Sequence, residues 1–273
     1  MEPYAANSSQ AGTRRGISIW SAAQLRDLGP LRIATFEVLY AFISLAGEPS
    51  SHDESLLDDQ ERARSRRFVH CVDRSRFVIA HAALRLVLAR SIGVDPAAIR
   101  YDHGVHGKPR LARDLRRLEF NLSHSQELAL VAVTRDRPVG VDVECLRVMS
   151  GGGLDLSDAP FSDTERKALR ALPPAERRAG FFRCWTRKEA LIKATGEGLS
   201  RDLDSFDVDV GPGCESALVQ IDGRIGEDTG WLLRDLPAPP GYAAAGAVDG
   251  GSHSPRTASR QSPPMGHMYW RNT

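Results

Sequence analysis

The chain lacks the features that mark secreted, membrane-spanning and nucleic-acid-binding proteins. No apolar run approaches the roughly 20 residues of a spanning helix, and the N-terminus has no hydrophobic region of a signal peptide. Its 36 basic residues offset 35 acidic ones, and the net charge of +1 creates no overall field that would attract nucleic acid or a membrane surface. The cysteines form no C-x-x-C pair, which favours free thiols in a reducing compartment; they are Cys71, Cys145, Cys184 and Cys214. We therefore expect a soluble protein of the cytoplasm.

The length of 273 residues suffices for one large domain or two small ones. Residues 1–16 are small and polar without periodicity, which predicts a flexible tail. Residues 250–273 are rich in Ser, Pro, Arg and Gly, which predicts a disordered tail. Between them we predict an N-terminal α+β half at 17–139 and a C-terminal α+β half at 140–249.

The two halves are expected to be copies of one unit. Small-residue strands stand late in each half, at Leu128–Val133 and Tyr242–Val248. The predicted fold class is therefore α+β, with the halves related by a pseudo-two-fold axis and an active site between them.

Hydrophobic periodicity and helix-boundary signals predict the individual elements. Helices are expected from 58 to 67, 76 to 92, 162 to 171 and 178 to 194. Strands are expected at 17–20, 118–122, 128–134, 139–143, 206–210, 217–221, 231–236 and 242–248. The strands at 128–134 and 139–143 are expected to form a hairpin, and Leu31–Leu45 a buried helix. The stretch from 28 to 53 is interpreted as an insertion without an assigned function.

Two carboxylates share one face of the strand in Gly140-Val141-Asp142-Val143-Glu144. Side chains two apart on a strand point the same way, and the alternating valines bury the opposite face. An isolated D-x-E is usually a solvated strand face. Two carboxylates aimed at one spot repel unless a proton or cation relieves them, and Mg²⁺ takes oxygen ligands of this kind. The metal interpretation is favoured.

A third carboxylate and a lysine lie on the helix predicted for Trp185–Lys193. Glu189 and Lys193 are four residues apart and so share a helix face. As a plain surface pair they would contribute only ~0.3–0.5 kcal/mol. The apolar side chains of Phe181, Phe182 and Trp185 indicate that this helix is anchored in the core. Three carboxylates and a lysine suit a divalent cation with a phosphate beside it.

Two further positions suit phosphate contacts. Lys108 in Gly107-Lys108-Pro109 is either a turn lysine or a phosphate partner held rigid by proline. His124 in Asn121-Leu122-Ser123-His124-Ser125 is either a structural histidine or, with Ser123, a hydrogen-bond donor to phosphate. The basic run Arg62–Arg67 is a solvated helix face or an anion site, because no aromatic residues interrupt it and no basic stripe continues it. Nucleic acid is not an expected partner.

Four motifs in a fixed order resemble the 4′-phosphopantetheinyl transferases. They are Gly107–Leu111, Phe120–Ser125, Gly140–Glu144 and Trp185–Lys193. The length and duplicated layout are similar to the surfactin-synthetase-activating type, and the resemblance covers about 17–248. Any one motif alone would be a weak signal, whereas four in order are specific.

The resemblance implies a holo-[carrier-protein] synthase. Such an enzyme moves phosphopantetheine from coenzyme A to a serine of an apo acyl or peptidyl carrier protein and releases adenosine 3′,5′-bisphosphate. Asp142, Glu144 and Glu189 would hold Mg²⁺, with Mn²⁺ as an alternative. Glu189 would also be the general base, and Lys193 would neutralise or protonate the leaving phosphate. The coenzyme A contacts implied are Arg64, Lys108, Ser123, His124, Asp142 and Lys193.

The same resemblance implies where the carrier protein is received and where this chain departs from its family. The segment Leu146–Phe161 would help to receive the carrier through Met149, Leu154 and Phe161. Glu61 stands where some relatives have a basic residue, and Phe77 where some have a small hydroxyl residue. A chain that makes its own site from two halves is expected to be a monomer.

Two alternatives stay open at this point. A metal-dependent nuclease also uses clustered carboxylates with a lysine, but it usually sets its glutamate and lysine two apart on a strand. A catalytically inactive relative that only binds carrier proteins is disfavoured because all three carboxylates and Lys193 are present. The natural carrier protein and its pathway are not encoded in any of these motifs.

Overall fold

A computed structural model describes residues 18–27, 29, 31, 37–104, 106–112, 118–147, 159–213 and 217–250, together with a strand at His267–Tyr269. The predicted tail at 1–16 lies outside the described residues, as do Met149, Leu154 and Cys214. No helix in the described ranges is long and apolar enough to cross a membrane.

Four helices lie where the periodicity predicts them, with shifted ends, but those at 22–26 and 51–56 were not predicted. The described part of the chain contains six α-helices. They are α1 (Ala22–Arg26), α2 (Ser51–Leu56), α3 (Asp59–Ser65), α4 (Cys71–Ile92), α5 (Asp163–Ala171) and α6 (Pro174–Thr195). Short 3₁₀ helices are η1 (Pro96–Ala98), η3 (Gly198–Ser200) and η4 (Gly226–Thr229). Gly93 and Gly196 end the two long helices in the left-handed conformation, which glycine adopts without steric cost.

In the described part of the chain, the strands form two main sheets and two small ones. They are β1 (Ile19–Trp20), β2 (Glu37–Ser44), β3 (Tyr101–His103), β4 (Pro109–Leu111), β5 (Leu118–Ser125), β6 (Leu128–Arg135), β7 (Val139–Cys145), β8 (Asp207–Val208), β9 (Leu218–Ile221), β10 (Arg224–Ile225), β11 (Trp231–Asp235), β12 (Tyr242–Asp249) and β13 (His267–Tyr269). The first sheet has the order β1-β2-β6-β5 and the second β11-β12-β7. The small sheets are β10-β9-β8 and β3-β4.

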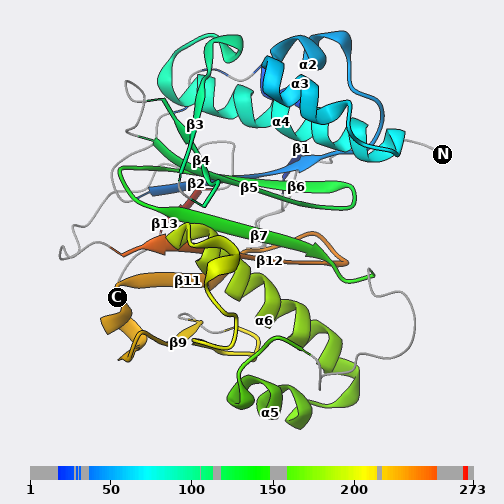
Figure 1. Cartoon of the computed structure of the whole chain (residues 1–273). Helices are drawn as coiled ribbons and strands as arrows, with labels where there is room; N and C mark the ends of the chain where they lie inside the picture. Colours follow the sequence, from blue (N-terminus) through cyan, green and yellow to red (C-terminus); the bar gives the residue numbers. More distant parts are fainter. Residues whose placement is uncertain are drawn as a thin grey trace, which may run out of the picture.

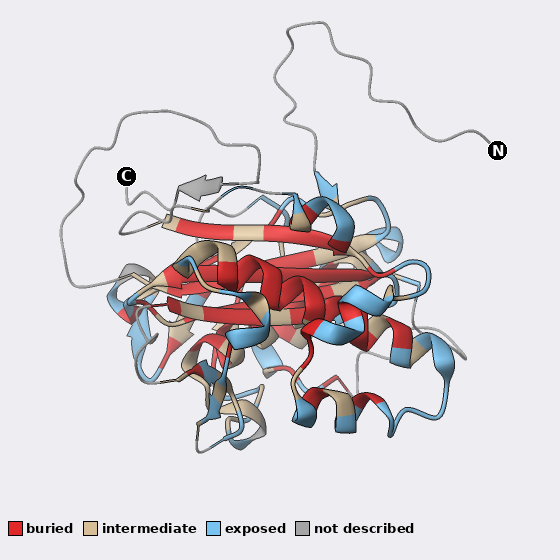
Figure 2. Ribbon diagram, turned by 90° about the horizontal axis from the view of Figure 1, so that it is seen from above, coloured by how far each residue is buried: buried red, intermediate tan, exposed pale blue. Residues whose placement is uncertain are grey.

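The two main sheets lie face to face between the two long helices (Figure 1). Helix α4 covers the outer face of the first sheet, and α6 covers the outer face of the second. Three clusters of buried apolar side chains fill the spaces between these layers. The long strands β2, β5, β6, β7 and β12 are mostly buried, whereas the short strands β3 and β10 are largely exposed. Other exposed residues gather on loops and outer helices (Figure 2).

Strand β6 is buried on both faces, which explains its unbroken apolar run. Ala129, Val131 and Val133 pack towards α4, whereas Leu130 and Ala132 pack against the second sheet. A strand with two buried faces needs no polar alternation.

Both halves use the same strand order, and the α+β fold class is confirmed. Strand β6 lies between β2 and β5, and β12 lies between β7 and β11, all antiparallel. The predicted counterparts at 128–133 and 242–248 are therefore the central strands of the two sheets. The pseudo-two-fold axis and the domain boundaries stay predictions, and β7 begins at Val139, one residue before the predicted boundary.

The prediction of a buried helix at Leu31–Leu45 is wrong. Residues 37–44 form β2, in the interior of the first sheet between β1 and β6. Leu39, Ala41 and Ile43 face α4, while Val38 and Phe42 face the second sheet. Burial on both faces removes the alternation by which a strand is recognised. The stretch interpreted as an insertion thus supplies a central strand.

The predicted hairpin between 128–134 and 139–143 is also wrong. Strand β6 pairs with β2 and β5, whereas β7 pairs with β12. The hairpin partner of β6 is β5, across a turn where Gln126 has a positive φ of 52°.

One part of the predicted disordered tail has regular structure. His267–Tyr269 pair with Glu37–Leu39 along the edge of β2 that β1 leaves open. Composition did not predict this strand because backbone pairing with an edge needs no apolar side-chain pattern. The rest of the tail beyond Gly250 lies outside the described residues.

Candidate active site

A close contact between α6 and β7 sets the geometry of the candidate site. A Cβ on Gly140 would lie 2.1 Å from the carbonyl oxygen of Ala190 and 2.3 Å from the amide nitrogen of Ala194. Only glycine therefore lets the C-terminal half of α6 rest on this strand. Val139, Val141 and Val143 point to the core between the sheets, so Asp142 and Glu144 point towards the helix, as the strand period predicts.

Lys193, Asp142 and Ser123 form a hydrogen-bonded group from α6, β7 and β5. The Nζ of Lys193 lies 2.5 Å from Oδ1 of Asp142 and 3.3 Å from Oγ of Ser123. Ser123 Oγ donates to the same carboxylate oxygen at 2.8 Å. Asp142 is buried, and its other oxygen, Oδ2, has no hydrogen-bond partner among the described residues. A buried carboxylate oxygen without a donor is costly, so this atom is suited to accept a cation or a ligand proton.

Glu144 and Glu189 are half-buried carboxylates that interact electrostatically with this group. Glu144 accepts a hydrogen bond from Ser125 at 2.7 Å. Burial raises the pKa of Glu144, and the negative charges of Asp142 and Glu189 raise it further. Burial also raises the pKa of Glu189, with Asp142 adding to the rise and Lys193 opposing it. The three carboxylates are therefore close enough to repel one another.

The described residues contain no group of three or more His, Cys, Asp or Glu side chains gathered closely enough to hold a metal ion. The donor set nevertheless fits a hard cation such as Mg²⁺. All three side chains offer carboxylate oxygens, one of them is the partnerless Oδ2 of Asp142, and their mutual repulsion favours a positive charge between them.

Side chains of β5 join the edges of the two sheets. Asn121, Ser123 and Ser125 share one face of β5, and each accepts a hydrogen bond from a backbone N–H of β7. The donors are Val141, Val143 and Cys145, at 2.9, 3.3 and 3.1 Å. We call this row of hydrogen bonds the seam between β5 and β7, formed by Asn121, Ser123 and Ser125. It supplies acceptors for the N–H groups on the free edge of β7 and holds the serines beside the carboxylates. Sequence reasoning missed Asn121 and Ser125, although their period of two with Ser123 was visible.

His124 lies on the opposite face of β5 from Ser123, as neighbours on a strand do. Partial burial lowers the pKa of its ring, although the residue as a whole stays exposed, and the charges of His81, Lys193, Arg64 and Arg76 lower it further. Arg64 is exposed, with its guanidinium 5.2 Å from the ring centre of Phe77. His124 and Arg64, both predicted phosphate contacts, thus share a basic surface.

The ammonium group of Lys108 already has hydrogen-bond partners within the protein. Its Nζ donates to the carbonyl oxygens of Val139 at 3.0 Å and Ala194 at 3.2 Å. It therefore ties the start of β7 to the end of α6, and burial lowers its pKa to about 8. The structure supports a positioning role for this lysine, and a contact with phosphate stays a prediction.

Glu61 and Phe77, the two departures from the family pattern, are both explained by local packing. Glu61 and the N-cap residue Asp58 form a capping box at the start of α3. The carboxylate of Glu61 also pairs with buried Arg85 at 2.6 Å and with His81 at 2.8 Å. Burial raises the pKa of Glu61, but the interactions with His81 and Arg85 outweigh it, so that the pKa is lowered overall. Phe77 stacks on His81 with ring centres 4.0 Å apart. The glutamate is thus neutralised by its neighbours.

Two basic residues of the Trp185–Lys193 motif serve the framework. Buried Arg187 pairs with both oxygens of Asp235 at 2.7 Å. Buried Lys188 pairs with buried Glu165 at 2.8 Å. These pairs anchor α6, which explains why Glu189 and Lys193 are held in place.

Phe161, predicted to help receive a carrier protein, is fully buried. Its ring centre lies 5.1 Å from that of Phe181 and 6.4 Å from that of Trp185. The prediction that it contacts a partner is therefore wrong, since it is a core residue of the C-terminal half.

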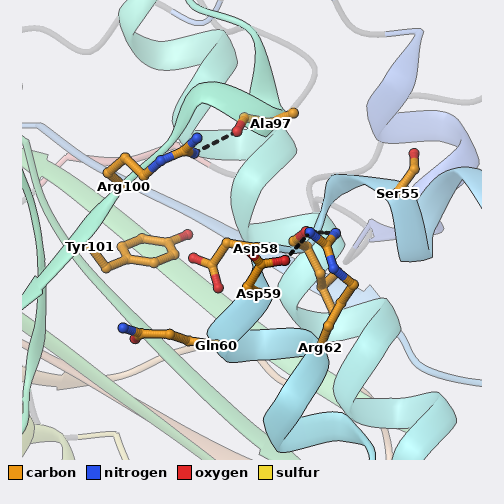
Figure 3. Close-up of a pocket in the computed structure, with 9 residues that line it drawn as sticks. Ser55, Asp58, Asp59, Gln60, Arg62, Ala97, Arg100 and Tyr101 are labelled. Carbon is orange, nitrogen blue, oxygen red and sulfur yellow. Dashed lines mark hydrogen bonds and ion pairs between the residues drawn. The ribbon is translucent and has the colours of Figure 1, made fainter.

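A pocket of about 320 Å³ lies between α2, α3 and β3 (Figure 3). Asp59, Arg62 and Arg100 line it, and Arg62 is paired with Asp59 at 2.9 Å. None of the predicted site residues lines this pocket.

Comparison with known proteins shows similarity to one enzyme family. Residues 138–244 match the model of the 4′-phosphopantetheinyl transferase superfamily, and residues 49–136 match that of the 4′-phosphopantetheinyl transferase N-terminal region. The chain is 36% identical over 214 residues to the 4′-phosphopantetheinyl transferase HetI of Nostoc sp., covering 77% of this chain and 86% of that protein. It is 33% identical over 170 residues to the 4′-phosphopantetheinyl transferase Sfp of Bacillus subtilis, covering 62% and 74%. It is 30% identical over 212 residues to the transferase ffp of Bacillus subtilis, covering 76% and 88%. The chain therefore belongs to the 4′-phosphopantetheinyl transferase superfamily.

Proposed function

We propose that this protein transfers the 4′-phosphopantetheine arm of coenzyme A to a serine of an apo acyl or peptidyl carrier protein. The observation that supports this most directly is the Lys193–Asp142–Ser123 group, with its partnerless buried oxygen and Glu189 beside it. Phosphoryl transfer needs reactants positioned and negative charge neutralised, and these residues supply both.

The reaction assigns a separate task to each side chain. The serine hydroxyl of the carrier attacks the β-phosphorus of the coenzyme A pyrophosphate, and adenosine 3′,5′-bisphosphate leaves. Glu189, with its pKa raised by burial, accepts the serine proton directly or through one water. Lys193, held by Asp142, faces the negative charge that develops on the leaving phosphate.

Asp142, Glu144 and Glu189 would hold Mg²⁺, or Mn²⁺ in its place. When bound, the ion supplies positive charge that stabilises the pyrophosphate oxygens as the bond breaks. Ser123 and His124 of β5, together with Arg64 of α3, would contact the nucleotide phosphates. The protein is expected to act in the cytoplasm. It is expected to be a monomer because both sides of its site come from one chain.

The direct test is mass spectrometry of apo carrier proteins incubated with the enzyme, coenzyme A and Mg²⁺. Carriers of fatty-acid, polyketide and peptide synthases, tested side by side, should show the mass of phosphopantetheine on at least one of them. No mass shift on any carrier would refute the proposal. A nuclease assay with Mg²⁺ on the same preparation tests the alternative, and DNA cleavage would favour it.

Metal binding can be tested without measuring turnover. Millimolar Mg²⁺ should raise the melting temperature of the wild type, because a ligand that binds only the folded state stabilises it. Asp142→Asn should lose this shift while keeping a folded, cooperative transition. An equal Mg²⁺ shift in Asp142→Asn would show that the ion binds elsewhere.

A further inference from the structure

The turn between α3 and α4 exposes apolar side chains that a soluble fold normally hides. Val69 is 91% exposed, Val72 51% and Phe68 37%. These are three of the six large apolar side chains exposed among the described residues, and they lie within five consecutive positions. Exposed apolar side chains gathered in one patch mark interaction surfaces.

Two basic side chains directly precede these apolar ones. Arg66 and Arg67 precede Phe68 and are exposed, and neither has an ion-pair partner in the part of the chain that the structure describes. We call Arg66, Arg67, Phe68, Val69 and Val72 the α3–α4 patch. In a chain whose net charge is +1, this patch is a local concentration of positive charge.

The α3–α4 patch adjoins the basic surface beside the candidate active site. The ring of Phe68 lies 5.3 Å from that of Phe77, and Phe77 stacks on His81. The charge of His81 acts on His124, which follows Ser123 in β5. A protein that presents a serine to Glu189 must cover surface around the site, and this patch is within the same neighbourhood.

We propose that the α3–α4 patch is a docking surface for the carrier protein, and that it contacts a face of the carrier with carboxylates around an apolar side chain. The inference rests on the proposed function. Exposed apolar side chains next to two arginines without an ion-pair partner among the described residues match such a face in both hydrophobicity and charge.

Other macromolecules match the patch less well. The short side chains of Val69 and Val72 bury little surface in a bilayer, where even one acyl chain gives only marginal anchoring. Phe68 packs on Phe77, so no aromatic ring stands free to stack on a base, as single-stranded nucleic acid requires.

Two substitutions test the patch against a matched pair of controls. Val69→Asp and Arg67→Glu change it, whereas Ile225→Asp and Arg224→Glu make the same changes at exposed positions on β10, in the other half. Steady-state kinetics with an apo carrier that the wild type modifies should show the KM for the carrier raised about five- to tenfold by each patch variant. The KM for coenzyme A, and kcat at saturating carrier, should stay within twofold of the controls.

Ionic strength provides a second readout. The KM of the wild type for the carrier should rise between 50 and 300 mM NaCl, and the rise should be smaller for Arg67→Glu than for Arg224→Glu.

The outcomes separate the two proposals. If the wild type modifies no carrier, the proposed function fails before any variant is compared. If it does, but the patch variants keep the carrier KM of their controls, the docking surface is wrong. A rise confined to the KM for coenzyme A would place the patch in the nucleotide site. Loss of binding to anionic vesicles or oligonucleotides with an unchanged carrier KM would assign the patch to a membrane or to nucleic acid, and each result overturns the inference.

Discussion

The hydroxyl of Ser123 serves both the framework and the site. It donates to Asp142 and accepts from the N–H of Val143 and from Lys193. Its removal leaves a buried N–H without an acceptor and takes one donor from the carboxylate. A buried polar group left unsatisfied costs about 1–3 kcal/mol.

Ser123→Ala should therefore lower both stability and turnover. We expect a loss of about 1–3 kcal/mol in the free energy of unfolding and a fall in kcat of about tenfold or more. Chemical denaturation and transfer kinetics measure the two effects. Ser125→Ala is the matched control, since it opens the same seam between β5 and β7 at Glu144 and should affect stability similarly. Wild-type turnover in Ser123→Ala would remove this serine from the site.

In the proposed function Glu189 is the general base, and its raised pKa then predicts a defined pH dependence of transfer. The base must be ionised, so kcat/KM should fall as the pH drops through the raised pKa, at a higher pH than an ordinary glutamate would require. Glu189→Gln should be slow, and the acid limb of its profile should be lost or moved to lower pH. An unchanged acid limb in Glu189→Gln would assign that limb to another group, such as Glu144.

The carboxyl group of Glu189 should also lower the free energy of unfolding at neutral pH. Because its charged form is disfavoured in the folded state, its contribution to stability is fully present below the pKa of an unfolded glutamate, about 4.3. That contribution is lost as the pH rises through the folded pKa. Glu189→Gln should therefore unfold at a higher denaturant concentration than the wild type at pH 7, and the difference should close near pH 4. If Glu189 is the general base that we propose, this loss of stability is the cost of half-burying its carboxylate.

At the scale of single residues, the sequence predicted the carboxylates and their direction because a strand period of two leaves little freedom. Lys108 shows the limit of this reasoning. A lysine in a rigid turn can reach phosphate or carbonyl oxygens equally well, and only the fold brings Val139 and Ala194 within its reach.

Among the elements, the contact between α6 and β7 is the one on which the site depends most. Gly140→Ala should force α6 away from β7, because the nearest obstacles are backbone atoms that cannot rotate aside. We expect a loss of about 1–3 kcal/mol in stability from overpacking. Transfer should fall at least tenfold, since Lys193 moves with the helix away from Asp142.

Gly180→Ala is the control for Gly140→Ala. It adds the same methyl group on α6 itself, where the nearest atom is the flexible end of Leu172. Alanine is also the better helix former. Its turnover should stay near that of the wild type. Equal turnover in both alanine variants would contradict the importance of the close contact.

Helix ends were predictable because their signals are local. Ser162 with Glu165 begins α5, and Gly93 ends α4. The errors at β2 and at the β6–β7 hairpin have a different cause. Strand pairing is decided by partners far away in the sequence, and a strand buried on both faces resembles a buried helix.

For the whole molecule, the core between the sheets belongs to both halves. Leu130 and Phe42 from the first sheet pack with Val141 and Val248 from the second. Neither sheet can be separated from the other without exposing this cluster. The two halves should therefore unfold together, although family models match them separately.

Calorimetry should show one unfolding transition. Leu130→Ala, which truncates a side chain at this shared core, should move the whole transition downwards by about 2–5 kcal/mol of stability. Trp20 in the N-terminal half and Trp231 in the C-terminal half offer separate fluorescence probes once the other tryptophans are replaced. Two midpoints, or a loss reported by only one probe, would show that the halves are independent.

The two halves share a strand order but differ in the side chains that their sheets turn towards the long helices. In the N-terminal half, β2 turns Leu39, Ala41 and Ile43 towards α4 and makes a tight apolar core. At the corresponding place in the C-terminal half, β7 turns Gly140 and Asp142 towards α6. The face of β2 on the side of α4 is thus apolar, whereas the face of β7 under α6 carries Asp142, which the proposed function assigns to the metal site. If all positions were mutated, substitutions in α4 and β2 should mainly lower the amount of folded protein. Substitutions in α6 and β7 should mainly lower the activity of protein that is present at its normal amount.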